Sequence, residues 1–225
     1  MRPSLAQLLS FVGGYVDTVG FLALQGLFTA HVTGNFVTFG AALVHGAAGA
    51  WAKLLALPVF CIAVLLTRLA SHRLERAGRP VLCILLWAQL AFLAIGAALA
   101  VTLGPFANAD RIDALLTGMV LVVAMAIQNT AHRAHLADAP PSTLMTGTTT
   151  QIMIDLADLL RGLPTDHPAR RRIARMAAAV AAFAFGCGLA ALLYYLVGLS
   201  AVALAPVVIL AAVADPGVTR LAPAP

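Results

Sequence analysis

The residues best suited to chemistry in this chain are polar groups that interrupt apolar segments of membrane length. A Thr-Gly pair occurs twice, as Thr33-Gly34 and as Thr146-Gly147, and Asp17 lies within an apolar run that begins near Leu5. Hydrocarbon cannot satisfy a free N–H or C=O group, so irregular backbone at membrane depth must lie against protein or a hydrated cavity. Two such interruptions at matching places in two halves of a chain are typical of transporters and channels.

Asp17 is the sharpest single candidate for a functional residue. A carboxylate near the middle of a membrane span costs on the order of 3 kcal/mol to insert and usually faces a polar interior. Such a group could carry a proton or help to bind a cationic or hydroxylated solute. The alternative is a structural carboxyl group that joins two helices by hydrogen bonds, and the sequence leaves both interpretations open.

The two Thr-Gly pairs predict a second feature, a half-helix that starts at membrane depth. Glycine lets the chain turn, and a following Thr or Asn can cap the new helix, a role open to Thr33, Asn35, Thr146 or Thr148. The start of such a helix presents N–H groups and partial positive charge, which favours anionic or polar solutes. The alternative is that these small residues only permit close helix packing.

Polar side chains near the two breaks extend the candidate solute or proton pathway. It comprises Asp17, His31, Thr33, Asn35, Gln128, Asn129, Thr146, Thr148, Gln151 and Asp155. Donors and acceptors of this kind line narrow selective pores. For Asp155 the alternative is an ion pair with the nearby Arg161 at a cytoplasmic helix end.

Composition places the chain among integral membrane proteins. Of its 225 residues 61% are apolar and 10% are charged, with a mean hydropathy of +0.95, whereas roughly 25% of residues are charged in soluble domains. With about 20 apolar residues for each crossing, the expected spans lie near 5–28, 53–69, 81–103, 112–131 and 173–197, with a shorter one near 198–214. Residues 35–50 and 143–160 stay ambiguous because they are short or polar.

The distribution of Lys and Arg favours six spans over eight, because positive residues gather in cytoplasmic loops. If the N-terminus is cytoplasmic and residues 35–50 and 143–160 are re-entrant, the chain's 14 Lys and Arg residues all lie inside except Lys53 and Arg111. A seven-span arrangement, with 35–50 crossing and the N-terminus outside, changes only the side of Arg2 and stays open.

A weak internal similarity favours the six-span arrangement. Asp17-Thr18 precedes Thr33 much as Asn129-Thr130 precedes Thr146. Each half then contains a span, a broken segment and two further spans, and three crossings place the second copy upside down. We therefore expect an all-α, polytopic membrane protein with about six transmembrane helices and two re-entrant or broken half-helices. It would form a single transmembrane domain over residues 1–225, an inverted repeat with halves of about 5–103 and 112–214.

The chain resembles a known family in several separated motifs. It is similar to the YoaK-like bacterial inner-membrane proteins (domain of unknown function 1275) in Gly13-Gly14-Tyr15-Val16-Asp17, Gly20-Phe21, His31-Val32-Thr33-Gly34-Asn35, Gln128-Asn129 and Thr146-Gly147. The resemblance covers most of the chain and implies a small multi-pass protein of the bacterial cytoplasmic membrane, without implying a substrate or activity. The second half departs most, since Thr148 stands where the first half has Asn35.

Other protein classes find little support in the sequence. It contains no G-x-S-x-G, no H-E-x-x-H and no nucleotide-binding loop, so we expect neither an enzyme nor a cofactor. His132, His135 and Asp138 have a spacing compatible with metal ligands, but Arg133 and the flanking residues predict a cytoplasmic loop and no metal site. The net charge of +5 comes from Arg residues at the ends of apolar segments, which argues against a nucleic-acid partner.

The expected function is therefore a transporter or channel for a small polar solute, with proton coupling through Asp17. Its expected partners are the lipid bilayer and a solute that the sequence does not identify, and its expected location is the bacterial inner membrane with a cytoplasmic N-terminus. The alternative is a helix-packing or scaffold protein without a solute path. Abundant Ala and Gly suit that role and would also allow a homo-oligomer.

Overall fold

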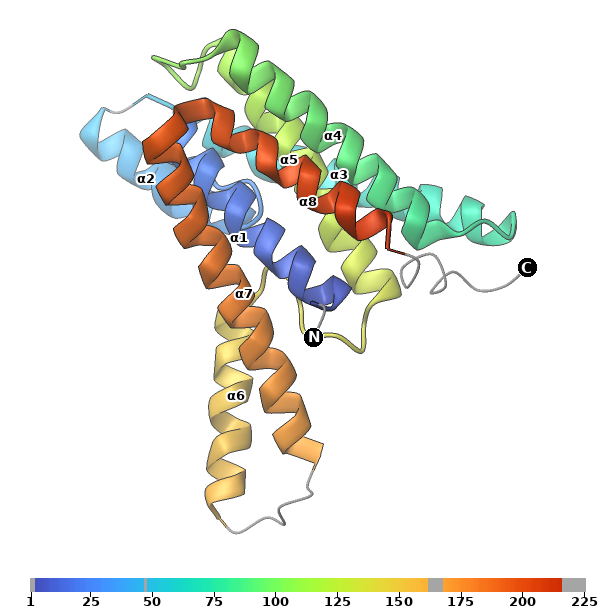
Figure 1. Cartoon of the computed structure of the whole chain (residues 1–225). Coiled ribbons are helices and arrows are strands. Elements are labelled where there is room, and N and C mark those ends of the chain that lie inside the picture. The colour runs from blue at the N-terminus through green and yellow to red at the C-terminus, as the bar shows by residue number, and fades with distance from the viewer. Residues whose placement is uncertain (1–2, 47, 162–167, 216–225) are drawn as a thin grey trace.

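The computed structural model of the protein describes residues 3–46, 48–161 and 168–215, and these residues form helices without a strand. Figure 1 shows a bundle from which α6 and the first half of α7 extend as a long hairpin. The α-helices are α1 (Leu5–Ala23), α2 (Asn35–His45), α3 (Ala50–Arg76), α4 (Val81–Leu103), α5 (Ile112–His135), α6 (Met145–Leu160), α7 (Pro168–Val197) and α8 (Leu204–Val213). Two short 3-10 helices, η1 (Val32–Gly34) and η2 (Gly198–Ala203), precede α2 and α8.

The expected all-helical membrane-protein character is confirmed. Among the described residues, five helical segments are long and apolar enough to cross a membrane: α1, α3, α4, α5 and the joined segment Pro168–Val213. The last of these bends at Gly198, whose φ is 59°. Helix α2 has 11 residues, so it is about 16 Å long and cannot by itself cross a hydrocarbon layer of about 30 Å.

The two ends of the bundle differ in charge. At the first end, here called the Gln25 end, the Gln25 side chain donates to the carbonyl of Ala107 at 2.9 Å and accepts from the N–H of Ala109 at 3.1 Å. Lys53 and Arg111 lie at this end. The opposite end, here called the arginine-rich end, carries the other described basic residues: Arg68, Arg73, Arg76, Arg79, Arg133, Arg161, Arg170, Arg171, Arg172 and Arg175.

Helices α1 and α5 run in opposite directions. The C-terminal end of α1 meets the N-terminal approach to α5 at the Gln25 end, through Gln25 and Ala107. Near the other end, Gln128 of α5 donates to the carbonyl of Leu9 in α1 at 2.9 Å. The same opposition holds for α3 and α7, because α3 starts at the Gln25 end while α7 starts at the arginine-rich end (Figure 1).

Glycine allows α1 and α7 to form the largest helix–helix interface of the described chain. A Cβ atom added at Gly14 would overlap the carbonyl oxygen of Phe183, and one added at Gly186 would overlap the carbonyl oxygen of Phe11. Small residues allow membrane helices this close an approach. Gly147 differs, because nothing lies within 4 Å of an added Cβ there. Close packing therefore does not explain the second Thr-Gly pair.

Each broken segment turns back toward the bundle interior before its short helix begins. Helices α1 and α5 end at C-caps of similar geometry, Leu24 (φ −120°, ψ 37°) and Leu136 (φ −130°, ψ 35°). The helices that follow start at N-caps that also match, His31 (φ −88°, ψ 57°) and Leu144 (φ −91°, ψ 63°). The two breaks thus begin and end with similar backbone angles, although the first also passes through two left-handed residues, Gln25 (φ 52°) and Gly26 (φ 87°), and the second through none.

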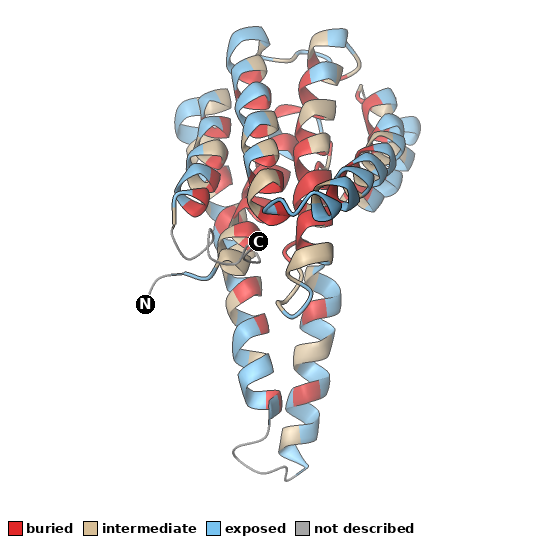
Figure 2. Ribbon diagram, turned by 90° about the vertical axis from the view of Figure 1, so that its right-hand side faces the viewer, coloured by how far each residue is buried: buried red, intermediate tan, exposed pale blue. Residues whose placement is uncertain are grey.

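Three local predictions need correction. Helix α6 leads away from the bundle along α7, so only the residues just before it return to the interior (Figures 1 and 2). The predicted loop around His132 and His135 is wrong, because α5 continues through both residues. No Thr or Asn side chain caps α2 or α6 at its N-cap position, because other residues hold the two turns in place.

Candidate functional site

Asp17 is the centre of the first break. It is 4% exposed, and its Oδ1 atom accepts hydrogen bonds from the backbone N–H groups of Thr29 at 2.7 Å and Ala30 at 2.8 Å. Its Oδ2 atom lies 2.7 Å from Nδ1 of His31. These contacts join α1 to the returning segment, so a single carboxyl group supplies the N–H acceptors that a side-chain cap would otherwise provide.

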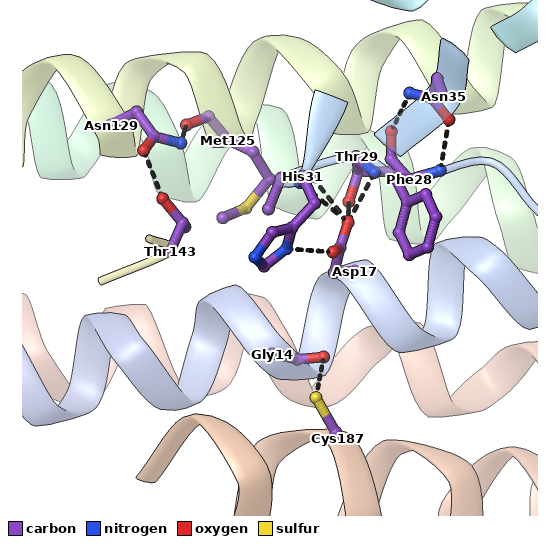
Figure 3. Close-up of polar contacts among 11 residues, drawn as sticks. Gly14, Asp17, Phe28, Thr29, His31, Asn35, Met125, Asn129, Thr143 and Cys187 are labelled. Atoms are coloured by element: carbon purple, nitrogen blue, oxygen red, sulfur yellow. Dashed lines mark hydrogen bonds and ion pairs between the residues drawn. The ribbon is translucent and has the colours of Figure 1, made fainter. Parts of the chain in front are cut away.

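His31 connects the first break to the second. Its ring pairs with Asp17 on one side and lies near the backbone of Thr143 in the second break. Figure 3 shows the ring between Asp17 and the Asn129–Thr143 pair. The ring of Phe183 in α7 lies edge-on to it, with 5.4 Å between ring centroids. The imidazole is thus the side chain at which both breaks and α7 meet.

A groove of about 600 Å³ opens beside the Asp17–His31 pair. Its walls are largely apolar and aromatic, while the carboxyl group, the imidazole and Thr33 supply its polar atoms. Few, well-placed polar groups in an apolar pocket are typical of small-molecule sites. The groove is lined by Asp17, Thr18, Phe21, Leu22, Phe28, His31, Thr33, Gly34, Phe183 and Cys187. The sequence-predicted residues Asp17, His31 and Thr33 therefore share one cavity.

Asn35 serves the loop, not the groove. Its Oδ1 accepts from the N–H of Phe28 at 2.8 Å, and its Nδ2 donates to the carbonyl of Phe28 at 2.7 Å. The residue is 1% exposed. Because both ends of the amide pair with the backbone of the same residue, Asn35 closes the turn that presents His31 to Asp17.

Gln128 and Asn129 hold the second break. Gln128 is fully buried and donates to Ser142 Oγ at 3.1 Å, while Asn129 Oδ1 accepts from Thr143 Oγ1 at 2.6 Å. Gln128 also accepts from Gln89 of α4 at 2.7 Å. These amides therefore fix the position of residues 142–143 beside α5.

The remaining predicted residues lie along α6, apart from the groove. Thr146 is exposed, and the buried Thr148 hydroxyl donates to the carbonyl of Leu144 within its own helix. Gln151 donates to Asp155 at 2.8 Å, and Arg172 of α7 binds both oxygens of Asp155 at 2.6 Å. Asp155 therefore takes part in an ion pair, as the alternative interpretation held, but its partner is Arg172 and not Arg161.

The sequence interpretation missed several residues that shape the site. Ser142 and Thr143 accept from Gln128 and donate to Asn129, respectively, and so attach the second break to α5. Phe183 and Cys187 line the groove from α7. Arg172 binds Asp155 and so joins α6 to α7. The Gly186-x-Gly188 pattern beside Cys187 was the available signal for a close helix contact. The sequence signal for Ser142 and Thr143 was weaker. These residues precede the second Thr-Gly pair by the same spacing as Thr29 and Ala30 precede the first.

No His, Cys, Asp or Glu cluster in the described residues could hold a metal ion. His132 is buried on α5 and His135 lies one turn further along. The chemistry that the groove offers is therefore hydrogen bonding, charge pairing and contact with aromatic faces.

Comparison with known proteins places the chain in a family. No curated protein and no solved structure matches it. A family model described as "Protein of unknown function (DUF1275)" matches residues 5–214, which covers every helix and both breaks. The separated motifs that suggested this family in the sequence therefore belong to one continuous match, and the chain is a member of the DUF1275 family.

Proposed function

We propose that the protein is a membrane transporter for a small polar solute, with the Asp17–His31 groove as part of the solute path. The observation that carries the proposal is the position of His31, which pairs with the buried carboxyl group of the first break and contacts the backbone of the second. Transport through a helical bundle requires two gates that respond to one site. A side chain that touches both broken segments provides a physical connection between such gates.

An inverted repeat, also part of the proposal, is supported by four matched features. Asp17 and Asn129 are 112 positions apart, as are the C-caps Leu24 and Leu136. Each of the two polar residues holds its own returning segment, and the helices that carry them run in opposite directions. Repeats of this kind place equivalent half-sites on opposite sides of the membrane, which is the basis of alternating access in several transporter folds.

The groove suits a small solute that combines an apolar part with a hydrogen-bond donor or a positive charge. Phe21, Phe28 and Phe183 offer aromatic faces, which attract cations as well as apolar groups. Asp17 lines the groove, and its Oδ2 atom, which pairs with His31, has lone-pair capacity for a second donor. A small amine or a hydroxylated organic molecule fits this combination.

Proton coupling follows from the same carboxyl group. As a carboxylate, Asp17 holds the N–H groups of Thr29 and Ala30 through one oxygen and the imidazole through the other. Protonation would remove the charge that favours these contacts and loosen the returning segment. A solute cation and a proton would then compete for the same oxygen, which is a simple way to couple their movements.

The proposed orientation has the arginine-rich end in the cytoplasm of a bacterium and six crossings of the inner membrane. It rests on the rule that cytoplasmic loops carry the excess of Lys and Arg and on the short length of α2, and it divides Pro168–Val213 at Gly198, so that η2 and α8 together make the sixth crossing. Single cysteines in place of Pro3 and Trp51, both exposed, test it with an impermeant reagent on intact cells. Labelling at 51 and not at 3 is expected, whereas labelling at 3 would favour the seven-span arrangement.

A helix-packing scaffold is the second candidate. It is favoured by polar side chains that hydrogen-bond within the protein, above all Asn35 with the backbone of Phe28. The close glycine contact between α1 and α7 also favours it. A scaffold does not require an open groove beside a buried carboxyl group. The transport measurement below separates the two candidates.

The test uses the full chain in proteoliposomes with a trapped pH-sensitive dye and a panel of small amines, amino acids and polyols. The wild type is expected to move at least one compound, and Asp17→Asn to reduce the rate at least tenfold. Asparagine keeps an acceptor for the two N–H groups, so the substitution imitates the protonated carboxyl group and cannot bind or release a proton. Asp158→Asn on the exposed face of α6 is the matched control. A wild type that moves none of the compounds, or an Asp17→Asn protein as active as the control, would overturn the proposal.

A further inference from the structure

A second cavity, of about 520 Å³, lies at the arginine-rich end beside the second break. Helix α3 lines it with Phe60, Val64 and Arg68, and helix α5 lines it with Asn129 and Arg133, among others. None of the functions considered above uses the two arginines. The cavity is therefore a separate feature that needs its own explanation.

The walls of this cavity correspond in sequence to those of the Asp17 groove. Asp17 and Phe21 of the first cavity are each 112 positions before Asn129 and Arg133 of the second. On the second wall, Phe183 and Cys187 of α7 are each 123 positions after Phe60 and Val64 of α3. Each cavity is thus lined by two helices, α1 and α7 in the first and α5 and α3 in the second, and the lining residues occupy corresponding positions. The architecture of the two sites is therefore alike.

The charge of the two cavities is opposite. An amide stands in the second where the first has a carboxyl group, and Arg133 stands where the first has Phe21. Arg68 adds a second guanidinium group from α3, about 12 Å before the end of that helix at Arg76. Arg68 stands where the apolar run of α3 ends, so its guanidinium group lies at the membrane interface of the arginine-rich end.

The donors that the second cavity can offer are those of the two arginines. The Asn129 side chain is used by Thr143 and Met125, and the Thr130 hydroxyl donates within its own helix. Arg68 makes one hydrogen bond, from Nη1 to Glu75 at 3.1 Å, while a guanidinium group has five N–H donors. Guanidinium groups bind carboxylate and phosphate oxygens in pairs.

We infer that this cavity is a binding site for an anionic group, a phosphate or carboxylate that carries an apolar chain. The guanidinium groups of Arg68 and Arg133 bind the anionic oxygens, and Phe60, Val64 and Ala134 contact the chain. The same chemistry is found in the headgroup region of an anionic lipid and in a small soluble organic acid. The inference does not depend on transport, since it needs only the cavity and its two cations.

The test measures binding to the purified full-length protein in a neutral detergent, by native mass spectrometry and by thermal unfolding. Dioleoyl phosphatidylglycerol is the lipid probe with dioleoyl phosphatidylcholine as its neutral counterpart, and hexanoate is the soluble probe at matched ionic strength. We expect at least tenfold tighter binding of one phosphatidylglycerol, or a saturable shift of the unfolding temperature with hexanoate. Saturation by the lipid identifies a lipid site, and saturation by hexanoate identifies a soluble acid.

Charge-matched variants separate this site from the general positive charge of the same end. Arg133→Gln and Arg68→Gln are each expected to lower the affinity for the anionic probe at least fivefold. Arg76→Gln, at the exposed end of α3, is expected to leave this affinity unchanged. Ala134→Trp fills the cavity without a change in charge and is expected to block the probe as well. If Arg68→Gln does not fold, the other variants decide. Equal weakening by Arg76→Gln and Arg133→Gln, undiminished binding to Ala134→Trp, or no binding of either anionic probe would overturn the inference.

Discussion

The two breaks in this molecule begin and end with similar backbone angles and are held by different chemistry. The caps at Leu24 and Leu136 agree within 10° in φ, yet the first returning segment is bound by a carboxyl group and the second by an amide. The carboxyl group of Asp17 engages two close N–H groups and an imidazole. The Asn129 oxygen accepts from the Thr143 hydroxyl. Backbone geometry is thus shared between the halves, while the strength and charge of each contact belong to the particular side chains.

The helices that carry the two breaks also differ in how closely they pack. A substitution at the close α1–α7 contact should have the largest effect on stability. Gly14 and Gly186 correspond to Ala126 and Ala63 in the other half, at the same spacings of 112 and 123 positions. Gly14→Ala introduces a methyl group onto the Phe183 carbonyl oxygen. We expect it to destabilise the protein by about 3 kcal/mol, the upper part of the range for overpacking.

Thermal unfolding in detergent measures this effect, with Gly188→Ala as the control because nothing lies within 4 Å of a Cβ at that position of α7. The control should be neutral or slightly stabilising, since alanine is the better helix former. Equal stability of Gly14→Ala and Gly188→Ala would show that the α1–α7 contact tolerates the alanine spacing of the other half.

The next effect separates the two polar anchors. Asp17→Ala leaves the N–H groups of Thr29 and Ala30 without their acceptor, whereas Asn129→Ala removes a contact to a hydroxyl group that can rotate. An unsatisfied buried donor costs about 1–3 kcal/mol. We therefore expect Asp17→Ala to be about 2 kcal/mol more destabilising than Asn129→Ala. Chemical unfolding of both variants measures the difference, and equal losses would mean that charge plays no part in holding the first break.

These two comparisons also explain what could be predicted from the sequence. The apolar runs predicted the helices because membrane-length segments leave the backbone few alternatives. The structure places Asp17, His31 and Thr33 at one groove, because the segment between them is short. The capping roles of Thr33 and Thr146 were wrong, because the groups that hold the turns come from α1 and α5 and are distant in sequence. The Asp155–Arg172 pair was missed for the same reason.

The two hairpins offer a third comparison. Helix α6 is fastened to α7 by the Asp155–Arg172 pair, whereas α2 reaches the bundle through Asn35 and its contacts with α3. Arg172→Ala removes two hydrogen bonds from a buried carboxyl group. Because the arginine side chain is half exposed, we expect a small cost that is confined to α6.

Hydrogen–deuterium exchange locates this cost. Exchange should increase in α6 and stay unchanged in α2. Arg171→Ala, the exposed neighbour, should change neither helix. Faster exchange throughout the bundle after Arg172→Ala would show that the α6–α7 hairpin is part of the core and not a separate extension.

The smallest effect is expected at the threonines of the two Thr-Gly pairs, which the sequence alone makes look equivalent. Both are exposed, so Thr33→Ala and Thr146→Ala should each change stability by less than about 0.5 kcal/mol. Thr33 lines the Asp17 groove, while Thr146 lies on the surface of α6. If the groove binds solute, Thr33→Ala should raise the half-saturation concentration for transport of that solute several-fold in proteoliposomes. Thr146→Ala should leave this concentration unchanged. Equal behaviour of the two variants in that assay would place the solute path away from Thr33. The likeness of the two pairs would then be one of sequence alone, since Gly34 and Gly147 both have right-handed helical backbone and the neighbouring side chains decide what each pair faces.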